Sequence, residues 1–303
     1  MKTQTKHSLM LMLCAFIWGT AFVAQSAGSG MGAYSFLAGR SWLAVLVLIP
    51  TVFAFDAVRK KQGQPYGWPK EKSERKTLLV AGLVCGTLLF AASAAQQIGI
   101  TINPSTAKAG FLTALYVVLV PVCGLFFKRK VSLPVWIAVA LSVIALYLLC
   151  INGEFSLAPG DLLILACAVC FTIHILVIDH FTATVDGVKL SCLQFLFAAL
   201  ISTVCMFLFE DVDFAAIWGC ILPLLYVGIF SCGVGYTLQI LAQKGSNPTV
   251  VTILLSLESV FAVIAGAIIL KQQMSVREYI GCAVMFAAVL LAQIDFPVKQ
   301  KAE

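Results

Sequence analysis

Residues 103–132 (NPSTAKAGFLTALYVVLVPVCGLFFKRKVS) and residues 247–275 (NPTVVTILLSLESVFAVIAGAIILKQQMS) share one plan, and this repeat decides the fold. Each stretch opens with Asn-Pro, continues as a long apolar run, and ends in a polar segment that contains lysine and closes near a serine. Asn is a preferred helix cap and Pro fits the first turn, so both openings are typical of a helix start. The two Asn-Pro pairs lie 144 residues apart in a chain of 303, which predicts two homologous halves.

The composition places both halves in a membrane. Hydrophobic residues make up 61% of the chain and charged residues 11%, whereas a soluble domain has about 25% charged residues. Ten apolar runs each have about the 17–25 residues that a helix needs to cross a bilayer. They cover approximately residues 8–27, 33–55, 77–100, 104–127, 133–151, 160–179, 189–209, 217–241, 248–270 and 277–296.

These runs fall five to each half, and five is an odd number. The second half must therefore enter the membrane from the side opposite to the first, as in many secondary transporters. Lipid offers no partner to backbone N–H and C=O groups, so each run is expected to be a helix. The sequence predicts an all-α integral membrane protein whose ten transmembrane helices form two inverted five-helix repeats, residues 1–151 and residues 152–303.

The basic residues predict the orientation. With a cytoplasmic N-terminus, sixteen of the twenty Lys and Arg residues fall on the inner side, which is the arrangement that the positive-inside rule favours. We therefore expect both termini in the cytoplasm and the protein in the plasma membrane, here a bacterial inner membrane. The net charge of +6 reports this topology. No basic face carries interleaved aromatic residues, so a nucleic acid is not an expected partner.

All eleven cysteines lie inside apolar runs, where cysteine behaves as a small hydrophobe. Cys167 and Cys170 have the spacing of a redox or metal site, but no second pair accompanies them and no carboxylate lies nearby. Packing is the favoured role for both, and we expect neither a metal nor a cofactor.

Four segments carry a family resemblance: Phe16–Thr20, Ala107–Pro121, Gly233–Thr249 and Leu255–Ala262. With them the chain resembles the EamA branch of the drug/metabolite transporter superfamily, over nearly its whole length and in two repeats. The family usually has Leu-Glu-Pro in its ninth helix, where this chain has Leu257-Glu258-Ser259. The resemblance implies a ten-helix carrier, most often an exporter of amino acids, metabolites or drugs. It also implies a central cavity formed chiefly by helices 1, 3, 4, 6, 8 and 9, which opens alternately to the two sides.

Charged residues inside apolar runs are expected to be paired or to have a function, because inserting an ionised group at the centre of a membrane helix costs about 2.5–3.5 kcal/mol. Glu258 lies ten residues beyond Pro248, roughly 15 Å deep at 1.5 Å per residue. It is a candidate proton-coupling group, or else a structural carboxyl. Lys108 lies roughly 6 Å deep by the same arithmetic and either snorkels to the surface or faces the cavity. Together they could bind a zwitterion such as an amino acid.

Two further ionisable residues are candidates for substrate binding or coupling. Arg40 lies about 10 Å inside the second run, where the favoured role is to tie helix ends together through backbone carbonyls. His174 in the sixth run either relays protons or is a core histidine bonded to a neighbouring helix.

Uncharged candidates complete the predicted site. Gln96 and Gln239 lie 143 residues apart, as repeat partners in helices 3 and 8, and they can bond across helices or to a substrate. Trp18, Tyr116 and Tyr236 are aromatic candidates for the cavity wall, although aromatic packing alone also explains each of them.

The sequence thus predicts a secondary transporter, with a small-molecule substrate, the lipid bilayer, protons and a second copy in a homodimer as the partners considered. No G-x-x-x-x-G-K-[ST] motif occurs, so ATP is not the direct driver. The alternatives are a non-transporting sensor or assembly subunit, and a membrane enzyme acting on a lipid-soluble substrate. The enzyme is disfavoured because neither HExxH nor a nucleophile elbow occurs.

Overall fold

The computed structural model describes residues 2–102, 106–126, 131–151, 158–269 and 274–294. Within these residues ten helical segments are long and apolar enough to cross a membrane, and their bounds follow the ten predicted runs closely. Large apolar side chains cover their outer faces, for example Leu46 and Phe207, which are 65% and 70% exposed. Such exposure fits a lipid environment, and the predicted all-α membrane fold is confirmed.

Seven of the ten spans in the described residues are single helices. They are α1 (Lys2–Ala27), α2 (Ala33–Lys61), α3 (Lys72–Ile102), α6 (Leu133–Cys150), α7 (Pro159–Thr182), α8 (Gly187–Phe209) and α14 (Val276–Ile294). The other three spans are divided. They are α4 (Thr106–Thr113) with α5 (Tyr116–Phe126), α10 (Ile221–Tyr226) with η2 (Val227–Gly235) and α11 (Tyr236–Gln243), and α12 (Pro248–Leu255) with α13 (Leu257–Ile269). Short helices η1 (Gly28–Gly30) and α9 (Phe214–Gly219) lie between spans.

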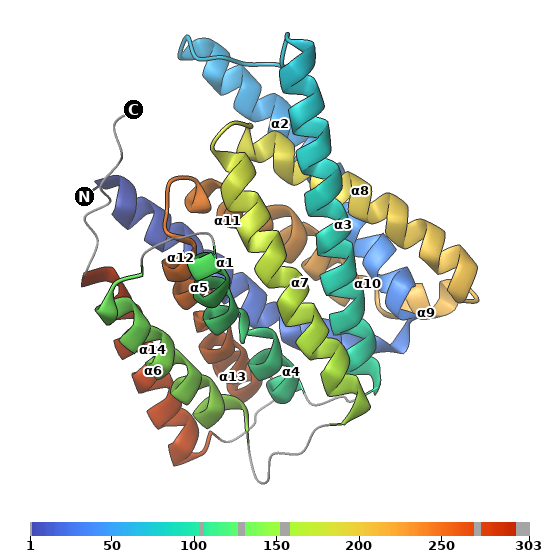
Figure 1. Cartoon of the computed structure of the whole chain (residues 1–303). Helices are drawn as coiled ribbons and strands as arrows, with labels where there is room; N and C mark the ends of the chain where they lie inside the picture. The colour runs from blue at the N-terminus through green and yellow to red at the C-terminus, as the bar shows by residue number, and fades with distance from the viewer. Residues whose placement is uncertain (1, 103–105, 127–130, 152–157, 270–273, 295–303) are drawn as a thin grey trace.

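The helix contacts repeat with the two halves exchanged. Helix α3 of the first half packs on α7 and α8, and the α10–η2–α11 span of the second half packs on α1 and α2. Helix α1 packs on α13, as α7 packs on α4 and α5, while α2 pairs with α8 and α6 pairs with α14. Figure 1 shows α6 and α14 side by side at one side of the molecule, with α3 and α8 at the other. This exchange is what a pseudo-two-fold axis between inverted repeats requires.

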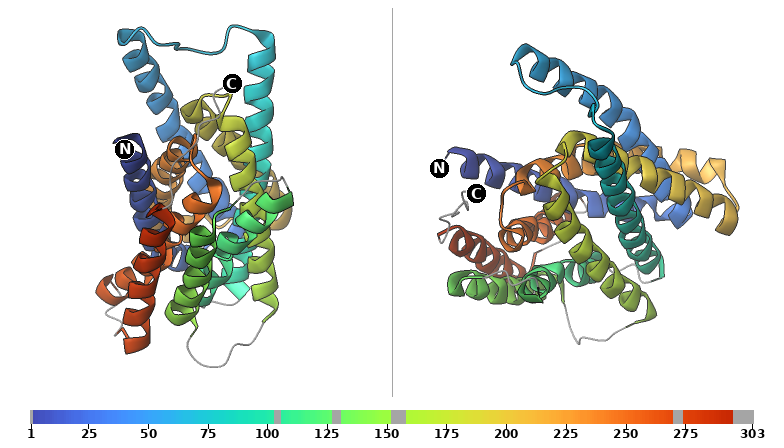
Figure 2. Two further views of the ribbon diagram at one scale, coloured as in Figure 1. Left: turned by 60° about the vertical axis from the view of Figure 1, so that its left-hand side comes forward. Right: turned by 45° about the horizontal axis from the view of Figure 1, so that its top comes forward.

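The chain enters and leaves the bundle at one end. Figure 2 shows that the start of α1, the end of α14 and the connection between α2 and α3 all lie toward this end. We call it the loop end, because residues 62–71 form its longest connection between spans. An even number of crossings returns the chain to the side where it started.

The fourth and ninth spans are interrupted at corresponding places. One interruption separates α4 from α5 at Ala114 and Leu115, and the other separates α12 from α13 at Ser256. At each interruption the backbone forms an i→i−3 hydrogen bond, as in a 3₁₀ turn. Val117 N donates to Ala114 O at 3.0 Å, and Ser259 N donates to Ser256 O at 3.2 Å. The ninth helix is therefore interrupted although Ser259 replaces the family's usual proline.

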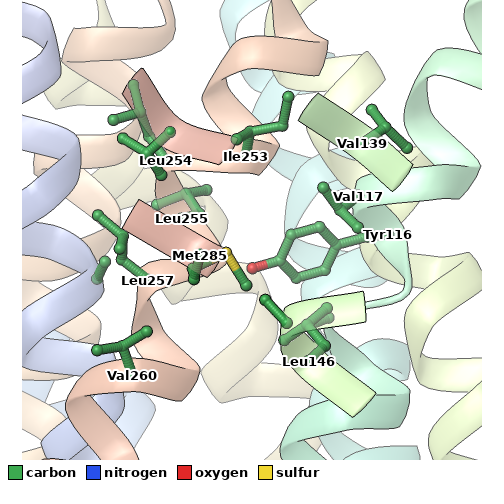
Figure 3. Packing of buried hydrophobic residues seen from close by; sticks show 14 of the residues in the cluster. Tyr116, Val117, Val139, Leu146, Ile253, Leu254, Leu255, Leu257, Val260 and Met285 are labelled. Carbon is green, nitrogen blue, oxygen red and sulfur yellow. The ribbon is translucent and has the colours of Figure 1, made fainter. Parts of the chain in front are cut away.

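A large apolar cluster surrounds these interruptions. Figure 3 shows the Tyr116 ring within it, with the hydroxyl pointing to the chain between Leu255 and Leu257. The cluster draws on α5, α6, α12, α13 and α14, and Val117, Leu146 and Leu257 within it are 0% exposed. Apolar packing thus holds both interruptions in place and brings Tyr116 to the start of α13.

Candidate functional site

A cavity lies where the two halves meet, and all three divided spans contribute to its wall. The volume of the cavity that is accessible to the centre of a water molecule is about 60 Å³. Its wall combines aromatic and other apolar side chains with polar and charged ones. The lining residues are Trp18, Phe22, Gln25, Leu37, Arg40, Ser41, Leu89, Phe90, Ser93, Gln96, Thr113, Tyr116, Phe171, His174, Ile175, Phe195, Ala198, Ser202, Ser231, Cys232, Tyr236, Gln239, Leu255 and Glu258.

Glu258 is held in this wall by Tyr116. The Tyr116 hydroxyl donates to Glu258 Oε1 at 2.8 Å, and the two side chains are each 3% exposed. Each residue follows the interruption in its own span, and the two lie 142 positions apart, close to the repeat period. The repeat therefore places a donor and an acceptor at matching positions of the two halves, and inversion brings them face to face.

Two of the family-like segments meet beside Glu258. A Cβ on Gly19 would lie 2.5 Å from the backbone oxygen of Glu258, so only glycine lets α1 approach α13 this closely. The neighbouring Trp18 donates from Nε1 to Ser231 O at 3.2 Å, and its ring lies 4.6 Å from the Tyr236 ring. A Cβ on Gly235 would lie 2.6 Å from Trp18 Nε1. Glycine at both positions thus brings the indole into the cavity wall.

The span that contains η2 is a second irregular feature of the wall. Residues Val227–Gly235 form a π-helix, and Ser231 and Cys232 within it line the cavity. Helical segments of this kind occur frequently at functional sites, because the extra residue per turn redirects side chains. A Cβ on Gly228 would lie 2.6 Å from Leu43 Cβ, so α2 packs directly against this segment.

Arg40 also lies in the wall, 6% exposed. Its Nη1 donates to Gln25 Oε1 at 3.3 Å, and its guanidinium carbon lies 5.9 Å from the centre of the Phe36 ring. The backbone carbonyl bonds expected for Arg40 do not occur among the described residues. Its hydrogen bond instead links α1 to α2 through two side chains.

The polar amides and His174 occupy different parts of the wall. Gln96 donates from Nε2 to Thr113 Oγ1 at 3.1 Å, which links α3 to α4. His174 Nε2 lies 3.1 Å from Gln194 Oε1, and this pairing puts the ring proton on Nε2 because an amide oxygen only accepts. Within the described residues, His174 Nδ1 and Gln239 Oε1 are buried without a hydrogen-bond partner.

Eight of the nine predicted site residues therefore line one cavity. They are Trp18, Arg40, Gln96, Tyr116, His174, Tyr236, Gln239 and Glu258. The ninth, Lys108, belongs to α4, but its side chain lies outside the part of the chain that the structure describes.

Of the predicted site residues that line the cavity, Arg40 lies on α2 and none lies on α8, so most of the contribution of these two helices was not predicted. The resemblance implied a cavity formed chiefly by other helices, yet α2 provides Leu37 and Ser41 beside Arg40, and α8 provides Phe195 and Ser202. Arg40, an arginine within an apolar run, was the feature of the sequence that could indicate that α2 contributes to the cavity wall. For α8 the signal was weak, because serine is common on packed helix faces in membranes.

The two halves are joined at both ends of the α2–α8 pair. At the loop end Lys189 Nζ lies 2.9 Å from Asp56 Oδ1, and Arg59 pairs with Asp186, which also caps α8. At the opposite end Glu210 accepts from the backbone nitrogens of Tyr34 and Ser35, at 2.7 and 2.8 Å. An acidic residue thus satisfies a helix N-terminus at each end.

Comparison with known proteins agrees with this architecture. The model of the EamA-like transporter family matches residues 5–151 and again residues 158–293. The chain belongs to the EamA-like transporter family. Its membership gives the repeated sequence a direct explanation, since each half carries one copy of the EamA-like domain.

An uncharacterized transporter of Archaeoglobus fulgidus is 28% identical over 293 residues, which cover 94% of this chain and 85% of that protein. A protein of known crystal structure has a TM-score of 0.76 with 17% identity, over 96% of this chain and 97% of its own. At this identity the structural likeness shows the fold alone. As an EamA-like protein, the chain is a multi-pass membrane transporter.

Proposed function

We propose that this EamA-like protein is a secondary exporter of small metabolites, amino acids or drug-like solutes, driven by protons. The observation that carries the proposal is the cavity between the halves, where buried polar and charged side chains come from both repeats. Buried charges inside a membrane protein typically mark a substrate or ion pathway, because they are costly elsewhere. The export direction is taken from the family resemblance.

The proposed mechanism is alternating access by rocking of residues 1–151 against residues 152–303. The ionic and capping contacts at the two ends of the α2–α8 pair would open in turn, while the site between them stays in place. We place the protein in the plasma membrane with both termini in the cytoplasm, because the loop end carries most of the basic residues. A homodimer is proposed as the working assembly.

Glu258 is the proposed proton-coupling group. Its carboxyl group has one hydrogen-bond partner among the described residues, the Tyr116 hydroxyl, so no basic side chain there fixes it in the charged form. A group that can be charged or neutral inside the cavity can exchange a proton for solute in each cycle. Lys108 on α4 is proposed to contribute from the outer part of the α4–α5 span, for a zwitterionic solute.

Flux measurements on purified protein in proteoliposomes test this function. A panel of amino acids, nucleosides and organic cations is loaded, and solute efflux is recorded together with internal pH. Wild type should release at least one solute and take up protons in return. Glu258→Gln should keep solute exchange but lose the pH change, and Lys108→Gln should slow zwitterion transport.

Glu278→Gln is the matched control, because Glu278 lies on α14 and bonds to Ser275 away from the cavity. It should behave as wild type. Wild-type proton movement in Glu258→Gln would contradict the coupling role. Absence of any solute flux would contradict transport itself and favour a sensor or assembly subunit, whereas chemical conversion of a lipid would favour an enzyme.

A further inference from the structure

Arg40 stands out in the cavity because it is a charged group that has no counter-ion in the part of the chain that the structure describes. The side chain is 6% exposed, and no carboxylate among the described residues lies within ion-pair distance of it. Its one hydrogen bond there goes to the neutral amide of Gln25. A guanidinium stays protonated in proteins, so it cannot escape burial by losing its charge.

Glu258, which lines the same cavity, does not neutralise Arg40. Its carboxylate bonds to the Tyr116 hydroxyl instead. A buried charge that lacks a partner is strongly unfavourable, and such groups are normally paired or bind a ligand. The remaining N–H groups of Arg40 therefore form an open fork in the cavity wall, of the shape that binds a carboxylate through two parallel hydrogen bonds.

A second polar group without a partner among the described residues lines the same cavity. Trp42 Nε1 donates to Thr203 Oγ1 at 2.9 Å, which fixes the register of α2 against α8 and places Ser202 within one helical turn of the level of Arg40. Ser202 is 1% exposed, lines the cavity, and its Oγ has no hydrogen-bond partner among the described residues. Its hydroxyl is available as a further donor to the same anion.

The charge and shape of the wall select the class of anion. Among the described residues, the charged side chains that line the cavity are those of Arg40 and Glu258, so this part of the wall does not offer the several cations that a phosphate dianion requires. Much of the remaining wall is aromatic or aliphatic, with Phe22, Phe90 and Phe195 on different helices. Such a wall accommodates an apolar body attached to a single charged head.

We propose that Arg40 and Ser202 form the anion subsite of the cavity, and that the transported solutes are organic monocarboxylates with an apolar body. This inference rests on the proposed transport function, because it takes the cavity as the place where the solute binds. It assigns Arg40 to substrate recognition and leaves proton coupling to Glu258.

Binding of three probes that share a phenyl group tests the subsite: phenylacetate, phenylacetamide and phenethylamine. Purified full-length protein is titrated with each probe, and affinity is taken from the rise of the thermal unfolding midpoint, since a ligand that prefers the native state stabilises it. Acetate and indole-3-acetate extend the series in body size. We expect phenylacetate to bind at least about tenfold more tightly than the amide, a difference of about 1.4 kcal/mol.

Three variants separate recognition from structure. Arg40→Gln should lose the preference for phenylacetate over phenylacetamide and leave amide affinity nearly unchanged. Arg40→Lys should keep part of the preference, because it retains the charge but not the fork. Arg277→Gln is the matched control, because Arg277 lies on α14, bonds to Tyr147 O and does not line the cavity. It should keep the full preference.

The proposal is overturned if wild type prefers the amide or the amine, or if Arg40→Gln keeps the anion preference. It is also overturned if none of the three carboxylates stabilises wild type at about 10 mM, well above KM values of about 1 mM. If Arg40→Gln does not fold, the preference of wild type for phenylacetate over phenylacetamide still tests the proposal. Proteoliposome flux separates the two claims. Flux of other solutes without carboxylate selectivity contradicts only this inference. Arg40-dependent binding without any flux contradicts the transport function and leaves the anion subsite as a binding site.

Discussion

At the scale of single residues, the contact between Tyr116 and Glu258 connects the two repeats. Glu258 was recognisable in the sequence as a charge deep in an apolar run, and Tyr116 as one of several aromatic candidates. That the two form a hydrogen bond of 2.8 Å could not be read from the sequence. It depends on inversion of the repeats, which brings matching positions of two distant spans together.

Removal of that hydroxyl should weaken the folded protein. Tyr116→Phe leaves the buried Glu258 carboxyl without its partner, so we expect a loss of about 1–3 kcal/mol in the free energy of unfolding. Unfolding of purified protein in detergent, followed by heat or denaturant, measures the loss. Tyr66→Phe is the control, because Tyr66 is 53% exposed, and it should match wild type. Equal stability of both variants would show that the contact contributes nothing.

At the scale of helices, glycine decides how closely spans approach. Gly82 and Gly86 lie on the face of α3 that packs against α8, and a Cβ on each would lie 2.6 Å from atoms of α8. Gly19 has the same role between α1 and α13, where the nearest atoms include backbone atoms of Glu258 and Ala262. Backbone atoms cannot rotate away, so a methyl group there must move a whole helix.

Gly19→Ala should therefore destabilise the protein by about 1–3 kcal/mol and reduce transport, since it pushes α13 and Glu258 away from α1. Gly110→Ala is the matched control on α4, because a Cβ there meets no atom within 4 Å. It should be neutral or slightly stabilising, as alanine favours helix over glycine. Thermal unfolding and proteoliposome flux of the two variants provide the measurement, and wild-type behaviour of Gly19→Ala would contradict the packing argument.

At the scale of the whole molecule, the even number of spans and the basic loop end define a topology. Gln64 lies in the α2–α3 connection at the loop end, and Asp211 lies between α8 and α9 at the opposite end; both are exposed. In intact cells, a membrane-impermeant maleimide should label Asp211→Cys, and it should label Gln64→Cys only after permeabilisation. Unmodified protein gives the background from its own eleven cysteines. Labelling of both positions from one side would contradict the inverted arrangement.

The sequence by itself determined the number of spans, the two repeats, their opposite orientation and eight of the residues that line the cavity. These follow from local rules, because span length is set by bilayer thickness and a charge in an apolar run is visible without any neighbour. The interruption at Ser256 also lies within Leu255–Ala262, one of the segments that carry the family resemblance. The proline that the family usually has in this segment is replaced by Ser259 here.

Only the tertiary structure decided which side chains satisfy one another. Arg40 bonds to Gln25 rather than to backbone carbonyls, α2 and α8 complete the cavity wall, and the Gly19 contact sets the place of Glu258. These contacts join helices far apart in the chain, so they depend on the simultaneous packing of all the spans. Close packing between helices in lipid is set by the shape of facing surfaces, and no single stretch of sequence contains both surfaces.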